Sequence, residues 1–334
     1  VFGLDVIWTP EFSRAGWLLD LSDVIDEVER EDFLEGPIKA NTFEGKLYAA
    51  PWYVDGGVLY YRKDLLDKHA MAPPLTFDEL ATSAQFILSR EKDPKLHGFI
   101  WQGKQYEGLV CAAMEFIYGN GGQVLDGDVA VVDQPQAVAA IDWMRKLIEV
   151  GITPELVTTA DEEATRNIFG SGRAIYMRNW PYAWNIFQRD ESAVKDKIGI
   201  IAMPHFPAGE PASTLGGWQL GINKHSRNPE AAKRFIRFMV SPDTQEELAI
   251  AVGYKPSRRS VYYRPEIQEA QPFIVELLSI MERTQPRPVT PFYPRITQIL
   301  QAEFSAVVSG IRPAEEAMKS AATEINKILE PARE

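Results

Sequence analysis

Aromatic rings and charged side chains recur in this 334-residue chain at positions where loops are expected. The rings belong to Trp8, Tyr53, Trp180, Tyr182 and Trp218, each just after an expected strand or in a loop with Gly or Pro. The charged side chains are those of Asp5, Asp55 and Arg287. A neutral sugar offers flat CH faces and hydroxyl edges, so its site needs rings for stacking and charged partners for the hydroxyls. Together the two sets predict a site for a neutral, polyhydroxylated ligand.

The stretch NTFEGKLYAAPWYVDGGVLYYRK connects part of this cluster to an apolar strand. Tyr53 and Asp55 stand where a loop tip is expected, and the glycines at 56 and 57 permit unusual backbone angles. A short β-prone run, Val58 to Tyr61, follows. We interpret this stretch as a ligand-contacting surface joined to a hinge.

A structural explanation competes with each of these assignments. A single tryptophan more often packs in a core than contacts a ligand, and Asp commonly serves as a turn residue or helix cap. Asp5 and Asp55 could also be the paired carboxylates of a glycoside hydrolase, an arrangement that depends on a separation the sequence does not give. Arg287 is either a surface arginine or a bidentate donor to vicinal hydroxyls.

Metal and nucleophilic chemistry have little support in the sequence. The four histidines (His69, His97, His205 and His225) are scattered without ligand spacing, and no cofactor is expected. The lone Cys111 has apolar neighbours, which indicate a buried hydrophobe rather than a nucleophile. No G-x-S-x-G elbow and no phosphate-binding loop occurs.

The overall charge narrows the class of partner. A net charge of −12 and a pI near 5.0 argue against nucleic acid and anionic membrane surfaces, which both require clustered Lys and Arg. No run of eighteen apolar residues occurs, so no membrane-spanning helix is predicted. A neutral ligand or a protein partner is expected instead.

The pattern of elements predicts an α/β protein. Apolar strands, such as those at Val1–Leu4, Gly98–Trp101 and Ala174–Met177, alternate with helical segments. Among the helical segments, Leu18–Val28 is one, and another starts at a capping box formed by Thr76 and Glu79. Such alternation favours mostly parallel sheets flanked by helices, and the length favours two lobes over one core.

Several segments in the same order resemble the family 1 extracellular solute-binding proteins, the sugar receptors of ABC importers. They are VFGLDVIWTPEF, GKLYAAPWYVDGGVLYYRKDLL, FIWQGKQYEGLV, IFGSGRAIYMRNWPYAW, LGGWQLGIN and GYKPSRRSVY, and together they cover nearly the whole chain. Within the family the sequence is most similar to the trehalose/maltose (α-glucoside) binding proteins.

The resemblance implies a two-lobed periplasmic-binding-protein fold of class II type with a three-segment hinge. By the order of elements in the family, residues 1–59 and 203–253 form the amino-terminal lobe, and residues 60–202 and 254–334 form the carboxy-terminal lobe. The hinge then consists of Val58–Tyr61, Ile198–Ala202 and the segment around Tyr254. The resemblance also implies the sugar contacts: Asp5, Trp8, Tyr53, Asp55, Trp180, Tyr182, Gly216, Trp218, Tyr254 and Arg287.

The chain departs from the family pattern at its amino terminus. Family members begin with a strand, a WHG-like turn and a long helix before the segment that corresponds to VFGLD. That strand and helix, and the secretory or lipoprotein leader, are missing here, so we expect this sequence to be part of a longer protein with an incomplete amino-terminal lobe.

The expected function is the capture of an α-linked disaccharide, of the trehalose or maltose type, between two lobes and its delivery to ABC permease subunits. The expected protein is a non-enzymatic monomer in the periplasm or outside the cell, with lipoprotein anchoring as a variant. Two alternatives stay open: the glycoside hydrolase that would use Asp5 and Asp55, and a sensor that presents a bound sugar to a receptor. Which sugar and linkage are bound depends on side-chain geometry.

Overall fold

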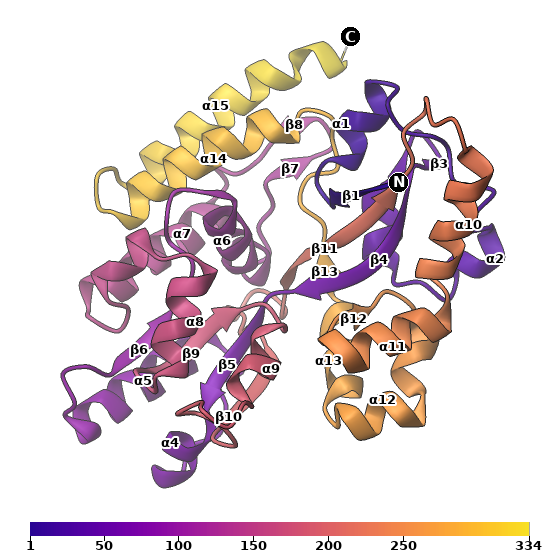
Figure 1. Ribbon diagram of the computed structural model, residues 1–334. Coiled ribbons are helices and arrows are strands. Elements are labelled where there is room, and N and C mark those ends of the chain that lie inside the picture. The colour runs from indigo at the N-terminus through magenta and orange to yellow at the C-terminus, as the bar shows by residue number, and fades with distance from the viewer. Residues whose placement is uncertain (334) are drawn as a thin grey trace. The chain divides into compact units, whose positions relative to one another are not determined.

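The computed structural model describes residues 1–333 and divides them into two compact units (Figure 1). Unit 1 consists of Val1–Gly56 and Thr214–Pro294, and unit 2 consists of Gly57–Ser213 and the segment from Arg295 onward. The chain therefore passes from one unit to the other after residues 56, 213 and 294. Within the described residues, no helix is long and apolar enough to cross a membrane.

Unit 1 is built on a five-stranded sheet with the order β1-β11-β4-β12, in which β13 also pairs with β11. Its strands are β1 (Phe2–Asp5), β2 (Thr42–Phe43), β3 (Lys46–Leu47), β4 (Ala49–Gly56), β11 (Ser213–Gly221), β12 (Lys255–Pro256) and β13 (Thr284–Gln285). Its helices are α1 (Thr9–Arg14), α2 (Glu27–Arg30), α3 (Glu35–Asn41), α10 (Pro229–Met239), α11 (Pro242–Val252), the 3-10 helix η2 (Arg259–Tyr263), α12 (Pro265–Ala270) and α13 (Ile274–Met281).

Unit 2 is built on a four-stranded sheet with the order β10-β5-β9-β6. Its strands are β5 (Val58–Arg62), β6 (His97–Ile100), β7 (Leu125–Asp126), β8 (Val129–Ala130), β9 (Ala174–Asn179) and β10 (Ile198–Ala202). Its helices are α4 (Lys63–Lys68), α5 (Phe77–Glu91), α6 (Glu107–Gly119), α7 (Pro135–Glu149), the 3-10 helix η1 (Glu155–Thr159), α8 (Glu162–Gly170), α9 (Ala183–Phe187), α14 (Tyr293–Val308) and α15 (Ala314–Arg333). The predicted capping box is present at the start of α5, where Thr76 and Glu79 each bond to the other's backbone N–H.

The prediction of mostly parallel sheets is wrong. The pair β6–β9 is parallel, whereas β1–β11, β11–β4, β12–β4, β10–β5 and β5–β9 are antiparallel. The direction of the chain explains this result. The segment β4–β5 leads from unit 1 into unit 2 and the segment β10–β11 leads back, so these strands pair antiparallel in both sheets.

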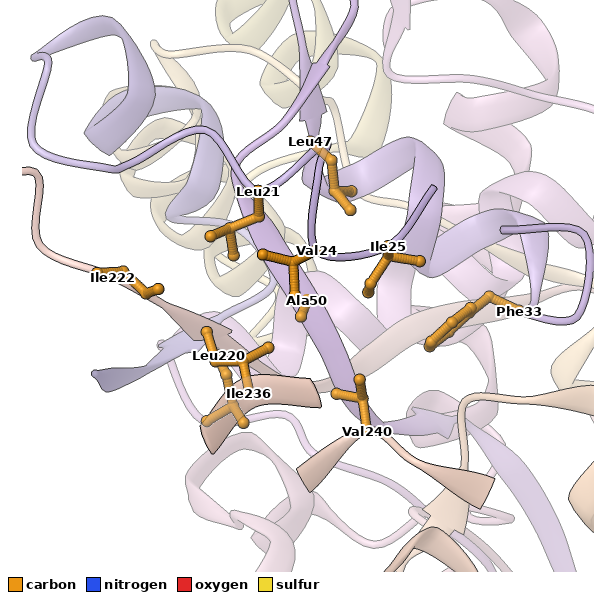
Figure 2. Close-up of a cluster of buried hydrophobic side chains, with 10 residues drawn as sticks. All are labelled: Leu21, Val24, Ile25, Phe33, Leu47, Ala50, Leu220, Ile222, Ile236 and Val240. Atoms are coloured by element: carbon orange, nitrogen blue, oxygen red, sulfur yellow. The ribbon is translucent and has the colours of Figure 1, made fainter. Parts of the chain in front are cut away.

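One hydrophobic cluster of unit 1 includes residues of the sheet strands β4 and β11 (Figure 2). The cluster consists of Leu21, Val24, Ile25, Phe33, Leu47, Ala50, Leu220, Ile222, Ile236 and Val240. Ala50 of β4 belongs to this cluster, and Trp52 packs against it. Pro51 and Tyr53 stand opposite consecutive residues of β11, so Trp52 is the extra residue of a β-bulge, and its ring meets that of Tyr53 at a centroid distance of 5.2 Å. The bulge interrupts the alternation of side chains along β4 just before the predicted contacts Tyr53 and Asp55.

The predicted helix over Leu18–Val28 is also wrong. The backbone there pairs with neighbouring strands: the amide of Leu19 donates to the carbonyl of Ile222 at 2.9 Å, and that of Leu21 donates to Leu47 at 2.7 Å. The apolar residues of this stretch reach the core from an extended backbone with turns, and a helix forms only from Glu27. Tertiary pairing therefore overrides the helical spacing.

The expected lobe boundary at residue 254 is corrected, because residues 254–294 belong to unit 1. The basic segment GYKPSRRSVY, which we interpreted as the third hinge segment, packs on unit 1 through ion pairs. Arg258 forms ion pairs with Glu29 and Asp32, and its guanidinium lies 4.1 Å from the ring centre of Phe33. The third passage between the units follows Pro294 instead.

The other boundary also moves, because residues 203–213 lie in unit 2. His205 forms a parallel bridge with Thr76, and the amide of Phe206 donates to the carbonyl of Gly119 at 2.9 Å. The second passage therefore comes after Ser213, and β10, which we expected in the hinge, is part of the sheet of unit 2.

Candidate ligand-binding site

Three predicted ligand contacts lie in a row across the sheet of unit 1. Asp5 at the end of β1 is registered opposite Trp218 on β11, and Trp218 is registered opposite Tyr53 on β4. The next row pairs Gly216 with Asp55. Directly opposed residues of an antiparallel pair lie about 5 Å apart at Cβ, so the two carboxylates and two rings belong to one face.

Trp218 is a partly exposed aromatic platform. Its side chain is 40% exposed, and its ring meets the ring of Trp8, itself 37% exposed, edge-on at a centroid distance of 6.3 Å. Gly217 has a φ of +100° and the strand register shifts after Trp218, which marks a bulge. Bulges redirect side chains, and the extra residue of this one is Trp52 of β4. The positive φ at 217 favours glycine there.

A buried polar network supports the two tryptophans from below. Asn41 accepts a hydrogen bond from the Thr9 hydroxyl at 2.8 Å and donates from its amide to Gln219 Oε1 at 2.9 Å. Thr9 follows Trp8 in the chain and Gln219 follows Trp218, so this network fixes α1 against β11. These buried hydrogen bonds therefore determine where the rings of Trp8 and Trp218 lie relative to one another.

Arg287 is buried beside Asp5. Its side chain is 4% exposed, and its Nη2 lies 3.3 Å from Asp5 Oδ1 and 3.4 Å from the carbonyl oxygen of Leu215. The surface arginine that we considered is thereby excluded. Arg287 also lies in unit 1 with Asp5, whereas we had expected it in the other lobe.

Tyr53 and Tyr254 form a second aromatic pair on unit 1. Their rings stack at 4.0 Å with an interplanar angle of 18°, and Trp52 meets Tyr254 edge-on at 5.6 Å. Burial first, and then the charge of Asp55, raise the pKa of Tyr53 well above its usual value. The phenol therefore keeps its proton and is able to donate to a ligand oxygen.

The two remaining predicted residues, Trp180 and Tyr182, follow β9 in unit 2 and are partly buried. The hydroxyl of Tyr60 donates to the carbonyl oxygen of Trp180 at 2.9 Å. The guanidinium of Arg178 lies 4.1 Å from the ring centre of Trp180, and the indole Nε1 donates to Glu162 Oε1 at 3.3 Å. Trp180 is thus held in place by several neighbours.

Sequence reasoning missed the residues around Trp180. Tyr106 donates from its hydroxyl to Glu162 Oε2 at 2.6 Å, and Arg178 forms a fully buried ion pair with Glu115. A buried ion pair cannot be recognised in sequence when its members stand 63 residues apart. The aromatic Tyr106 in the polar loop WQGKQYEG was the one available signal.

The structure thus places eight of the predicted residues in unit 1, namely Asp5, Trp8, Tyr53, Asp55, Gly216, Trp218, Tyr254 and Arg287, and two in unit 2. The described residues contain no group of three or more His, Cys, Asp or Glu side chains that could hold a metal ion. Both partly exposed faces combine flat rings with carboxylates, which suits a neutral ligand with hydroxyl groups.

Comparison with known proteins identifies the family. The family model for bacterial extracellular solute-binding proteins matches residues 1–246. The chain belongs to this family. Members of this family bind solutes for ABC transporters and are not enzymes, which removes the glycoside hydrolase as an alternative.

Two of its relatives match nearly the whole chain. A probable ABC transporter-binding protein of Deinococcus radiodurans is 39% identical over 314 residues, which cover 92% of this chain and 74% of the relative. The solved structure of maltose-bound MalE3 of T. maritima is 44% identical with a TM-score of 0.90, and the match covers 98% of this chain and 83% of that chain.

A third match is more distant in sequence but equally complete. The GacH receptor of Streptomyces glaucescens is 25% identical with a TM-score of 0.85, over 98% of this chain and 82% of that chain. The solute-binding protein described here therefore has the α/β fold of the periplasmic-binding-protein class and is of the sugar-importer type. Its family is extracellular, which fits a periplasmic or extracellular location.

Proposed function

We propose that this solute-binding protein captures an α-linked glucose disaccharide of the maltose or trehalose type. The observation that carries the proposal is the row formed by Asp5, Trp218 and Tyr53, with Arg287 behind Asp5 and Asp55 one step along the sheet. A glucose ring presents a CH face to an indole and its hydroxyls to flanking carboxylates.

The proposal assigns a role to each group. The rings of Trp218 and Trp8 stack on the sugar, and the carboxylates of Asp5 and Asp55 accept hydrogen bonds from its hydroxyls. Arg287 holds Asp5 and neutralises part of the negative charge on this face. Of the other predicted contacts, Tyr53 and Tyr254 donate or stack from unit 1, Gly216 leaves room beside Asp55, and Trp180 and Tyr182 add contacts from unit 2.

The similarity to maltose-bound MalE3 supports an α-glucoside as ligand, because the match is 44% identical and covers 98% of this chain. The proposal also includes delivery of the sugar by a monomer to the permease subunits of an ABC importer, either from free solution or from a lipoprotein anchor. A gene for a sugar permease next to the gene for this protein would support transport over sensing.

A thermal-shift panel of glucose, maltose, trehalose, sucrose and palatinose tests the ligand class. A ligand that binds only the folded state at a hundred times its Kd stabilises that state by about 2.7 kcal/mol. We expect maltose or trehalose to raise the melting temperature and the sugar to be recovered intact. A flat response to every sugar would contradict the α-glucoside proposal.

A further inference from the structure

Glu162, in the first turn of α8, accepts hydrogen bonds from two aromatic side chains at once. Its Oε2 accepts from the hydroxyl of Tyr106 at 2.6 Å, and its Oε1 accepts from the indole Nε1 of Trp180 at 3.3 Å. Burial is the main cause that raises the pKa of Tyr106, and the negative charge of Glu162 adds to it. The phenol therefore keeps its proton and remains a hydrogen-bond donor. Each carboxylate oxygen thus holds one ring.

The backbone of Trp180 is fixed independently of Glu162. Its amide donates to Asn179 Oδ1 at 2.8 Å, and its carbonyl oxygen accepts from the hydroxyl of Tyr60 at 2.9 Å. These bonds fix the backbone of Trp180 but leave the side-chain torsion angles of the indole undetermined. The hydrogen bond to Glu162 is the polar contact that fixes the indole itself.

One face of the Trp180 ring is already covered. The guanidinium of Arg178 lies 4.1 Å from the ring centre and is held by two hydrogen bonds to Glu115, at 2.7 and 2.6 Å, and one to Gln102 at 3.0 Å. A ligand can therefore stack only on the opposite face. The orientation of the indole decides whether that face is presented.

Tyr106 is confined from the other side by Gly108. A Cβ atom at position 108 would overlap the hydroxyl of Tyr106. The absence of a side chain at 108 allows the phenol to reach Glu162, and Lys104 lies over the phenol ring at 5.8 Å from its centre. Both rings therefore converge on a single carboxylate.

We propose that Glu162 is a positioning residue that orients Trp180 and Tyr106 as one aromatic wall for the sugar. This inference rests on the proposed function and deepens it. It names the residue that determines how strongly the aromatic rings of unit 2 bind the sugar. Glu162 acts through the two rings and does not itself contact the sugar. Its neighbour Glu163 is a matched control, because that side chain is 64% exposed and pairs with Arg166.

The first test uses the protein without ligand. In Glu162→Gln the amide oxygen can accept from one ring donor, but the amide NH₂ group cannot accept from the other. We expect the indole N–H resonance of Trp180, identified in a ¹H–¹⁵N spectrum by its loss in Trp180→Phe, to move in Glu162→Gln and to stay in place in Glu163→Gln. An unmoved Trp180 resonance in Glu162→Gln would overturn the proposal.

The second test measures maltose affinity by calorimetry in a double-mutant cycle. Glu162→Gln should weaken binding about tenfold, the effect of losing one hydrogen bond to a charged group. In a background that carries Trp180→Phe and Tyr106→Phe, the same change should cost less than about twofold, because the donors are gone. An equal loss in both backgrounds would show direct contact with the sugar and overturn the proposal.

Glu162→Asp separates position from charge. The shorter side chain keeps the negative charge but cannot reach both rings, so we expect its affinity to fall as in Glu162→Gln. Affinity restored to the wild-type value would show that charge alone suffices and would overturn the proposal. If the wild-type protein bound no sugar of the panel, the proposed function would fail, while the ligand-free spectrum would still decide the role of Glu162.

Discussion

Lys255 on β12 is a buried lysine whose ammonium group is hydrogen-bonded to an amide. Its side chain is 1% exposed, and its Nζ donates to Gln271 Oε1 at 2.7 Å. Burial lowers the pKa of Lys255 from 10.5 to about 8, although the charge of Asp55 opposes this change. The folded protein therefore carries a desolvated ammonium group at neutral pH, and Lys255→Met is the perturbation that removes it.

The sign and size of the effect follow from linkage. Between pH 8 and 10.5 the unfolded chain binds more protons at Lys255 than the folded chain, so stability rises with pH through this window. A decrease of about 2.5 pKa units corresponds to about 3.4 kcal/mol that opposes folding below pH 8. Between pH 7 and 9.5, about 2 kcal/mol of that cost is relieved.

Urea unfolding at pH 7, 8, 9 and 9.5 measures this directly for the wild type, Lys255→Met and Lys319→Met. Relative to Lys255→Met, the wild type should gain about 2 kcal/mol in free energy of unfolding from pH 7 to 9.5. The bond that Gln271 loses in the variant adds a constant offset and does not change the slope. The range ends at pH 9.5 because the raised pKa values of buried tyrosines such as Tyr53 lower stability at higher pH.

Lys319, exposed on α15, controls for the loss of a lysine charge as such. Its replacement should leave the pH slope of the wild type unchanged. If the difference between the wild type and Lys255→Met were the same at every pH, the argument from burial would be refuted.

Three further predictions concern the proposed ligand site. The first is that Trp218→Ala weakens maltose binding by up to about 60-fold. The side chain of Trp218 is 40% exposed, which is about 100 Å² of roughly 250 Å², and burying that area contributes about 25 cal/mol per Å². Trp17→Ala, at another exposed tryptophan, should leave that affinity unchanged, and equal effects would contradict the platform. Asp55→Asn should weaken binding tenfold or more, by about 1.5 to 3 kcal/mol, in calorimetry without any change in sugar hydrolysis; unaltered affinity would remove Asp55 from the site. Small-angle scattering should show a smaller radius of gyration with saturating disaccharide, as expected if the two-lobed capture predicted from the sequence is correct, and an unchanged radius would argue for a one-sided site.

Local signals in the sequence predicted the parts of the fold that depend on near neighbours. The capping box at Thr76 and Glu79 forms as expected. The strand at Ala174–Met177 is the core of β9, and Cys111 is buried. In each case the interacting groups lie within a few residues of one another, so propensity and spacing suffice.

Long-range partners could not be predicted in the same way. Arg287 reaches Asp5 across 282 positions, and Arg258 reaches Glu29 across 229. The local composition of the basic segment around Arg258 does not tell whether the chain crosses between the lobes there or packs on unit 1 through ion pairs. The misplaced boundary at residue 254 and the wrong lobe for Arg287 have this common cause.

The Gly56–Gly57 pair shows how a correct signal can have a different physical basis. We expected these glycines for their backbone freedom, but neither has a positive φ. Their role is close packing on each side of the passage between the units. A Cβ at 56 would lie 2.6 Å from Thr284 in unit 1, and a Cβ at 57 would overlap the carboxylate of Glu115 in unit 2.

The contact at Gly57 connects the chain passage to the part of unit 2 where we propose that a ligand binds. Glu115 holds Arg178, and Arg178 covers one face of the Trp180 ring. The first residue of unit 2 thus packs directly on the ion pair that supports its aromatic platform. A side chain at 57 would have to displace Glu115. Glycine is therefore required there by the packing against the Glu115–Arg178 ion pair and not by the backbone conformation of a turn.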